Sequence, residues 1–143
     1  MSTPYAVVDN SLLNKITDDL LLTMPDEYLE KTIDSFRVSA SIKFKQCPSL
    51  LNRDDVLRQY NSTLTDEEVE ILSNLMVLEW LKQRINSIEL LKQNMSLKDY
   101  HMYSQANHLD TLLKLRKDTS SDIDRLIVSY TYSNNNLSDL GKV

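Results

Sequence analysis

The sequence predicts a mainly α-helical protein, a three- to four-helix bundle with a long central helix and an extended or strand-like C-terminal tail. Three observations support this fold class. The 143 residues include a single glycine, Gly141, so the positive φ angles that hairpin turns, Rossmann folds and phosphate loops require are scarce. Helix-start signals occur near Pro25 and at Thr65. Apolar residues then recur at helical spacing after each of them.

Charge and cysteine content disfavour several classes of protein. The formal net charge is -5 and no segment is strongly basic, whereas a protein that coats DNA needs clustered Lys and Arg. The single Cys47 cannot form an intrachain disulfide, and the N-terminus lacks the pattern of an export signal. No apolar run reaches the roughly 18 residues that cross a bilayer. We therefore expect a soluble protein made in a reducing cytoplasm.

We expect three parts: an N-terminal leader or arm at residues 1–24, a helical domain at 25–127 and a C-terminal docking tail at 128–143. The first helix should begin at Pro25, because proline presets a helical φ and the acids after it face the positive end of the helix dipole. It should end near Pro48, because proline disfavours helical geometry in the residue before it. Its apolar face has spacings of three and four residues: Leu29, Ile33, Phe36, Ala40 and Phe44.

The clearest local signal is the start of the central helix. Thr65 and Glu68 have the spacing of a capping box, and Leu64 and Val69 have that of a hydrophobic staple. Nothing interrupts the helical pattern before about Asn94, and apolar residues cover much of its circumference. This should be the most buried helix of the protein.

The segment before this helix, "SLLNRDDVLRQYN", is predicted to form a turn with a short helix. Its sequence is rich in residues that cap helices and turns, and either Asn52 or Asp54 could cap this short helix. The adjacent carboxylates Asp54 and Asp55 could in principle act as acid and base or hold magnesium. Capping, and pairing with Arg53 or Arg58, is the stronger interpretation, because neighbours in sequence seldom point the same way.

The last long helix is expected to begin at Ser104, a good N-cap, after "YHMYS" interrupts the pattern; Ser96 and Asp99 repeat the capping spacing more weakly. The polar stretch "KDTSSD" should point outward or form a loose turn. One face of this helix carries mainly apolar residues: Leu109, Leu112, Leu113, Arg116, Ile123, Leu126, Ile127 and Tyr130.

The end of the chain changes its period. In "IVSYTYS" Val128, Tyr130 and Tyr132 alternate with small polar residues, which is typical of a strand. From Arg125 to Tyr130 a helix and a strand are equally supported, and beyond Tyr130 the extended form is favoured. A lone strand exposes unpaired backbone groups and could add to a sheet edge of another chain. The predicted partner-docking residues are Val128, Tyr130, Tyr132, Leu137 and Leu140.

Signs of catalysis or metal binding are weak. His101 and His108 are two helical turns apart, too far for one small ion, and His101 is expected in a loop. Cys47 precedes a proline and lacks any nucleophile signature, so a small buried residue is expected. Trp80 lies near Lys82, yet a core tryptophan beside solvated charges is favoured over a nucleic-acid stacking surface. We predict no enzyme activity, no cofactor and no metal.

The order of the segments "LNRDDVLRQYN", "LTDEEVEILSNLMVLEWLKQRINSIELLKQ", "SLKDYHMYSQANHLDTLLKLRKD" and "LIVSYTY" resembles the head–tail connector (neck adaptor) proteins encoded among the morphogenesis genes of tailed phages. The resemblance spans residues 25–140. The pieces that carry it are Arg53-Asp54-Asp55, Glu79-Trp80-Leu81, Lys98-Asp99-Tyr100 and Tyr103-Ser104-Gln105-Ala106-Asn107. With Thr65 and Glu68 of the capping box, these are structural motifs. The chain departs from the family at its end, where Ser133-Asn134-Asn135-Asn136 intervene and the glycine is delayed to Gly141.

The resemblance implies a non-enzymatic virion protein of the phage neck. Such a protein forms a ring of about twelve copies under the portal protein and contacts another neck or tail-completion protein. DNA would pass through the lumen without sequence-specific binding, and an acidic or mixed wall would avoid trapping its phosphates. Two alternatives stay open: a DNA packaging subunit of small-terminase type, which would need a compact basic helix pair, and an enzyme or enzyme regulator, which would need a convergent pocket.

Overall fold

The structure is a computed structural model that describes the backbone of residues 2–16, 25–94 and 99–134, and their side chains except at 88–108 and 134. Within these ranges four α-helices, one 3-10 helix and a small sheet are present. In chain order they are β1 (Thr3–Pro4), α1 (Tyr5–Lys15), α3 (Asp26–Lys43), η1 (Pro48–Leu51), β2 (Arg53–Asp54), β3 (Gln59–Tyr60), α4 (Asp66–Asn94) and α5 (Asp99–Asn134). The predicted helical class is confirmed.

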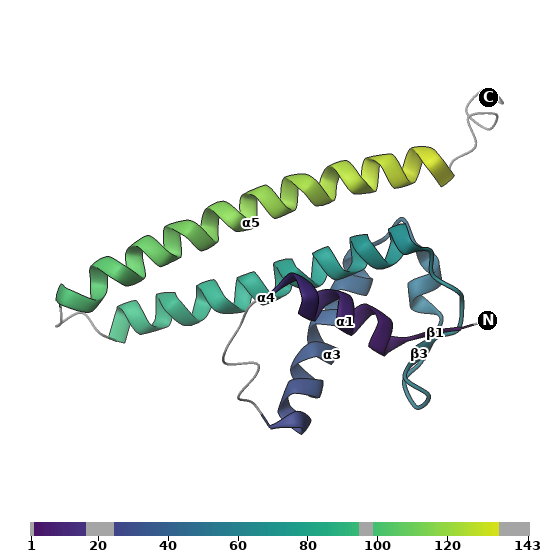
Figure 1. Ribbon diagram of the computed structural model, residues 1–143, viewed down its shortest axis with the longest axis horizontal. Coiled ribbons are helices and arrows are strands. Elements are labelled where there is room, and N and C mark those ends of the chain that lie inside the picture. Colours follow the sequence, from purple (N-terminus) through teal and green to yellow (C-terminus); the bar gives the residue numbers. More distant parts are fainter. Residues whose placement is uncertain (1, 17–24, 95–98, 135–143) are drawn as a thin grey trace.

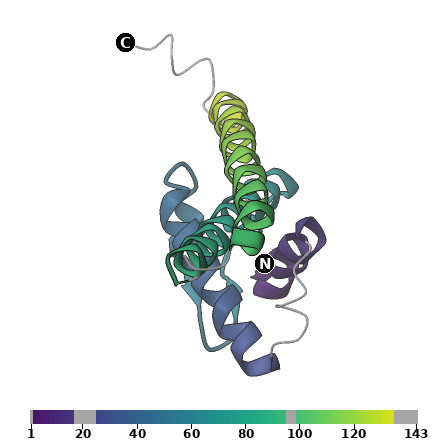
Figure 2. The same ribbon diagram turned by 90° about the vertical axis from the view of Figure 1, so that its left-hand side faces the viewer.

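Helix α4 is the centre of the fold, as its apolar sequence predicted. It packs against α1, α3 and α5. Helix α5 runs back along one side of α4, so that the two form a long helical hairpin, while α1 and α3 lie on the other side (Figures 1 and 2). The structure is therefore a helical bundle with one long pair and two shorter helices beneath it.

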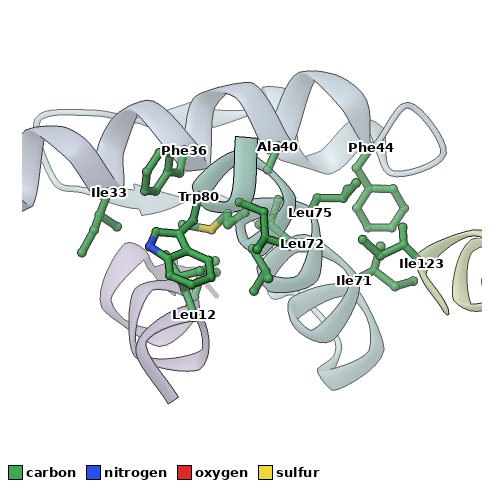
Figure 3. Close-up of a cluster of buried hydrophobic side chains, with 14 of the residues drawn as sticks. Leu12, Ile33, Phe36, Ala40, Phe44, Ile71, Leu72, Leu75, Trp80 and Ile123 are labelled. Carbon is green, nitrogen blue, oxygen red and sulfur yellow. The ribbon is translucent and has the colours of Figure 1, made fainter. Parts of the chain in front are cut away.

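The core lies between α4 and its three helical neighbours. Leu12 of α1, Phe36 of α3 and Ile123 of α5 all point toward α4 side chains, among them Leu72 and Trp80 (Figure 3). Trp80 is only 7% exposed, which confirms its predicted place in the core. Burial of each such large apolar side chain contributes about 1.5–3 kcal/mol to folding.

The two predicted helix starts are confirmed. The Thr65 backbone N–H donates to Glu68 Oε1 at 2.8 Å, and the Glu68 N–H donates to Thr65 Oγ at 3.1 Å, which is the predicted capping box. Helix α4 then continues to Asn94 without interruption. Helix α3 begins directly after Pro25, with Asp26 and Glu27 in its first turn, and ends at Lys43, a few residues before Pro48.

The N-terminal residues differ from the predicted leader. Thr3–Pro4 pairs with β3, and Tyr5–Lys15 forms helix α1, whose Tyr5, Val8 and Leu12 are buried in the core. These residues therefore belong to the folded domain. Helix α1 has little local signature, because it lacks a side-chain cap and begins with no acidic residue, so its main support is tertiary packing on α4.

The segment after η1 is a β-hairpin, where a turn with a short helix was expected. Strands β2 and β3 pair antiparallel, Arg53 opposite Tyr60, and β1 adds to the other edge of β3. Scarce glycine does not prevent this hairpin, because Arg58 itself takes a left-handed conformation with φ of 54°. Asp54 Oδ1 accepts bonds from the backbone N–H groups of Val56 and Leu57, so Asp54 caps the turn.

Helix α5 corrects two predictions. It begins at Asp99 and runs through "YHMYS" and "KDTSSD" without a break, so the expected interruption, the start at Ser104 and the loop at His101 are wrong. It also continues to Asn134, so the helix is the correct one of the two forms left open for Arg125 to Tyr130, and the extended form favoured beyond Tyr130 is wrong as far as Asn134. A helix satisfies its own backbone groups, whereas a strand needs a partner, and burial of Ile123 and Tyr130 against the body stabilises the helical form.

Candidate interaction surfaces

The β2–β3 hairpin presents an exposed apolar tip, formed by Val56 and Leu57 in the turn between the strands. These side chains are 92% and 66% exposed, although each is a large hydrophobic residue. The loop between the strands points away from the α4–α5 pair (Figure 1). Single exposed apolar residues are common, but adjacent ones at a projecting tip are typical of a contact surface. We call this surface the hairpin tip.

The hairpin that carries this tip is held firmly to the helices. The Tyr5 hydroxyl donates to Asp55 Oδ1 at 2.6 Å, and the Tyr5 backbone N–H donates to the Arg58 carbonyl at 3.0 Å. Arg58 in turn forms a two-pronged ion pair with Asp34 of α3, at 2.8 and 3.1 Å, and contacts Glu30 at 3.1 Å. The tip is therefore exposed while its base is fixed at several points.

Beneath the hairpin lies a buried ion network centred on Arg37, which is 3% exposed. Its guanidinium donates to both carboxylate oxygens of Asp9 at 2.7–3.0 Å, pairs with Asp34 at 2.7 Å and lies 4.1 Å from the centre of the Tyr5 ring. Burial raises the pKa of Asp9 despite this pairing. Burial also acts to raise the pKa of Asp34, but its bonds to Arg58 and Arg37 lower it below the usual value. The network joins α1, α3 and the hairpin.

A second exposed surface lies on the last turns of α5. Val128 and Tyr132 are 55% and 66% exposed and are four residues apart, so they share one helix face. Both were predicted to dock on a partner, and their exposure is compatible with that role. We call this pair the α5 end patch.

Tyr130, also predicted to dock, is instead a core residue. It is 7% exposed, its ring packs edge-on against Phe44 at 5.2 Å between centroids, and its hydroxyl donates to Glu68 Oε2 at 2.8 Å. The prediction failed because it assumed a strand, in which alternate residues share a face. In a helix, residues 128 and 130 point about 200° apart around the axis.

The carboxylate of Glu68 is the anchor between α4 and α5. Its Oε2 accepts bonds from the Tyr130 hydroxyl and from Cys47 Sγ, both at 2.8 Å, and its Oε1 accepts from the Thr65 N–H. Burial acts to raise the pKa of Glu68, but these donors outweigh it and hold the pKa below its usual value. Burial and the bond to Glu68 raise the pKa of the Cys47 thiol to about 11. Cys47 is thus buried, as predicted, and stays protonated.

The other predicted motif residues have structural roles where the structure describes them. Arg53 Nε lies 3.4 Å from Asp55 Oδ1, so the adjacent carboxylates serve pairing and capping, as the stronger interpretation held. Asp99 is the first residue of α5. Tyr103, Ser104 and Asn107 belong to α5, but their side chains, like those of His101 and His108, lie outside the described part. Lys98, Leu137 and Leu140 lie outside the described residues altogether.

Comparison of the chain with protein-family models, with curated proteins and with solved structures finds no match. Among the described residues, no group of three or more His, Cys, Asp or Glu side chains is arranged to hold a metal ion. Over the same part of the chain, no helix has the length and apolar character needed to cross a membrane.

The hairpin tip was missed by sequence reasoning, although a signal existed. In "NRDDVLRQ" two apolar residues, Val56 and Leu57, stand together among charged and amide residues. Tyr60 follows them at helical spacing, which favoured a short helix, whereas the turn that Asp54 caps leaves both side chains exposed.

Proposed function

We propose that this protein is a structural, non-enzymatic subunit of a phage neck, a head–tail connector that forms a ring under the portal protein. The observation that carries the proposal is the hairpin tip, an exposed apolar surface on a firmly held base. A docking element of this kind binds without the entropic cost of first ordering a loop. The segment resemblance to neck adaptors supplies the context in which such a docking element would act.

The α5 end patch supports the same proposal from a second position. It lies on a different element from the hairpin tip, so one chain could contact two different proteins at once. For a connector these would be the portal protein and another neck or tail-completion protein, or a second copy of the chain in the ring. In the assembled virion the net charge of -5 would favour passage of DNA through the lumen without tight binding.

Co-sedimentation with portal-bearing, DNA-filled capsids tests this function. We expect the purified chain to bind at a saturable, fixed number of copies per capsid. A variant truncated after Asn134 tests whether the last nine residues contribute to capsid binding, because it keeps Tyr130 and the whole of α5. The matched measurement is binding to free duplex DNA over a range of salt concentrations. Absent capsid binding together with tight, salt-dependent DNA binding would instead favour a packaging subunit of small-terminase type.

A further inference from the structure

A groove of about 790 Å³ lies between α4 and α5, beside the C-terminal end of α3. Its walls combine apolar, hydroxyl and cationic side chains, with Leu78 and Leu113 half-buried against the core. Four lining residues are cationic and one is acidic: Lys43, Lys82, Arg116 and Lys117, with Glu79. On a chain whose net charge is negative, such a concentration of positive charge is a local exception.

Most of this positive charge has no acidic partner among the described side chains. Lys43 pairs with Glu79, which neutralises the groove's one carboxylate. Lys82, Arg116 and Lys117 are exposed and make no ion pair within the part of the chain that the structure describes. The groove therefore suits an occupant that brings several carboxylates together with an apolar or aromatic side chain.

The beginning of α3 has this complementary character. Asp26, Glu27 and Glu30 are exposed there, and Tyr28 between them is 64% exposed. The end of the helix that carries them lies away from the α4–α5 pair (Figure 1). We call these four residues the α3 tip. Glu30 already contacts Arg58 and Glu27 contacts Lys31, but both pairs are exposed and so contribute little to stability.

A chain cannot place its own α3 tip in its own groove. Lys43, which lines the groove, ends the 18-residue helix whose first residue is Asp26. A rise of about 1.5 Å per residue holds the two ends of α3 about 25 Å apart. Any contact between tip and groove must therefore join two chains, and because the two surfaces differ, the contact is head-to-tail.

We infer that the α3 tip of one copy docks in the α4–α5 groove of the next copy. Its carboxylates would meet Lys82, Arg116 and Lys117, and Tyr28 would lie over Leu78 and Leu113. A head-to-tail contact repeats from chain to chain, so it generates a closed ring or an open filament and never stops at a symmetric dimer. The inference rests on the proposed function for ring closure, and it identifies the surfaces by which neighbouring copies join.

Paired charge reversals test this contact in the absence of capsids. Lys82→Glu/Lys117→Glu reverses the groove and Asp26→Lys/Glu27→Lys reverses the tip. Analytical ultracentrifugation at high protein concentration and low salt should show self-association of the unmodified protein and its loss in each variant. An equimolar mixture of the two variants should associate again, because each reversed surface meets a reversed partner. Lys45→Glu/Lys114→Glu is the matched control, which removes equal charge outside the groove and should associate normally.

Tyr28→Ala provides a second variant that leaves the helix dipole interactions of Asp26 and Glu27 intact, and it should weaken association at least tenfold. Circular dichroism of each variant shows whether it is folded. A mixture that stays monomeric, or an unmodified protein that never associates, would overturn the inference. If the protein still binds capsids in that case, the connector function stands and only the tip–groove contact is wrong. If the groove variant lost DNA binding while its self-association stayed unchanged, the groove would be a DNA-binding surface, and the inferred tip–groove contact would be wrong.

Discussion

The hairpin tip and the α5 end patch are supported by buried polar groups of different kinds. The hairpin tip stands on an ion network, in which Arg37 and Arg58 share the carboxylates of Asp9 and Asp34. The α5 end patch stands next to Tyr130, whose hydroxyl donates to the single carboxylate of Glu68. The hairpin tip is thus supported by paired positive and negative charges, whereas the α5 end patch is supported by one negative charge that accepts hydrogen bonds from neutral donors.

This difference determines how each support can fail. The ion network is vulnerable to the loss of a partner, because removing one charge leaves the opposite charges buried and unpaired. Acid should change the stability of this network only slightly. The pKa of Asp34 is lowered, so its contribution is lost as the pH falls, whereas the pKa of Asp9 is raised, so its contribution has the opposite sign. At Glu68 the described hydrogen bonds involve no second carboxylate with an opposite pKa shift, so protonation of Glu68 weakens this anchor directly.

The largest effect is expected from Arg37→Ala. This change leaves Asp9 and part of Asp34 without their partner in a buried site, and should lower the free energy of unfolding by about 3–5 kcal/mol. Urea denaturation at neutral pH measures it. Arg53→Ala is the matched control, since Arg53 forms a more exposed pair with Asp55 and should change stability by less than about 1 kcal/mol. Equal losses in both variants would show that the network is not the support of the hairpin.

A smaller effect is expected from Tyr130→Phe. The ring and its contact with Phe44 stay, while Glu68 Oε2 loses one of its two donors, so the free energy of unfolding should fall by about 1–3 kcal/mol. Tyr132→Phe removes the hydroxyl of an exposed tyrosine on the same helix and should change stability by less than about 0.5 kcal/mol. If the two variants were equally stable, Tyr130 would not be the anchor of α5.

Acid should weaken the Glu68 anchor. The folded pKa of Glu68 lies below its ordinary value of 4.5, so its contribution is fully present above pH 4.5 and is lost as the pH falls through the lower folded pKa. Urea midpoints measured from neutral pH down to strongly acidic pH should therefore decline, and Glu68→Gln should flatten the decline below pH 4.5 although it lowers stability at neutral pH. An unchanged slope in that variant would assign the acid response to other carboxylates.

The smallest effect concerns the reactivity of Cys47. With its pKa raised to about 11, the thiol is protonated at mildly alkaline pH, and it is also buried. Reaction with a thiol reagent under these conditions should therefore be slow and should accelerate in urea in step with unfolding. Rapid labelling of the folded protein would mean that α5 lifts from α4 readily, and that the anchor is weak.

Local signals explain the parts of the fold that were predicted correctly. The capping box of α4 and the Pro25 start of α3 depend on residues within one helical turn, so the sequence contains them in full. The apolar face of α3 and the burial of Trp80 agree with helical periodicity alone. Cys47 was predicted to be buried, but its bond to Glu68, 21 residues away, has no local signature.

The errors arose where distant contacts decide the local structure. The alternation in "IVSYTYS" predicts a strand as well as a helix, and only the fit of Tyr130 beside Phe44 and Glu68 selects the helix. The hairpin depends on Arg58 in a left-handed conformation and on the Tyr5–Asp55 bond across 50 residues. Neither feature is visible in a short window of sequence.

The most direct test of the central claim is the effect of Val56→Ser/Leu57→Ser on binding to portal-bearing capsids. Both side chains are exposed, so the variant should be as stable to urea as the unmodified protein, within about 0.5 kcal/mol. Ile42→Ser/Leu115→Ser, which removes two exposed apolar residues elsewhere, serves as the control. We predict that the hairpin variant loses saturable capsid binding while the control keeps it. Full binding by a folded hairpin variant would contradict the assignment of the hairpin tip as the docking surface.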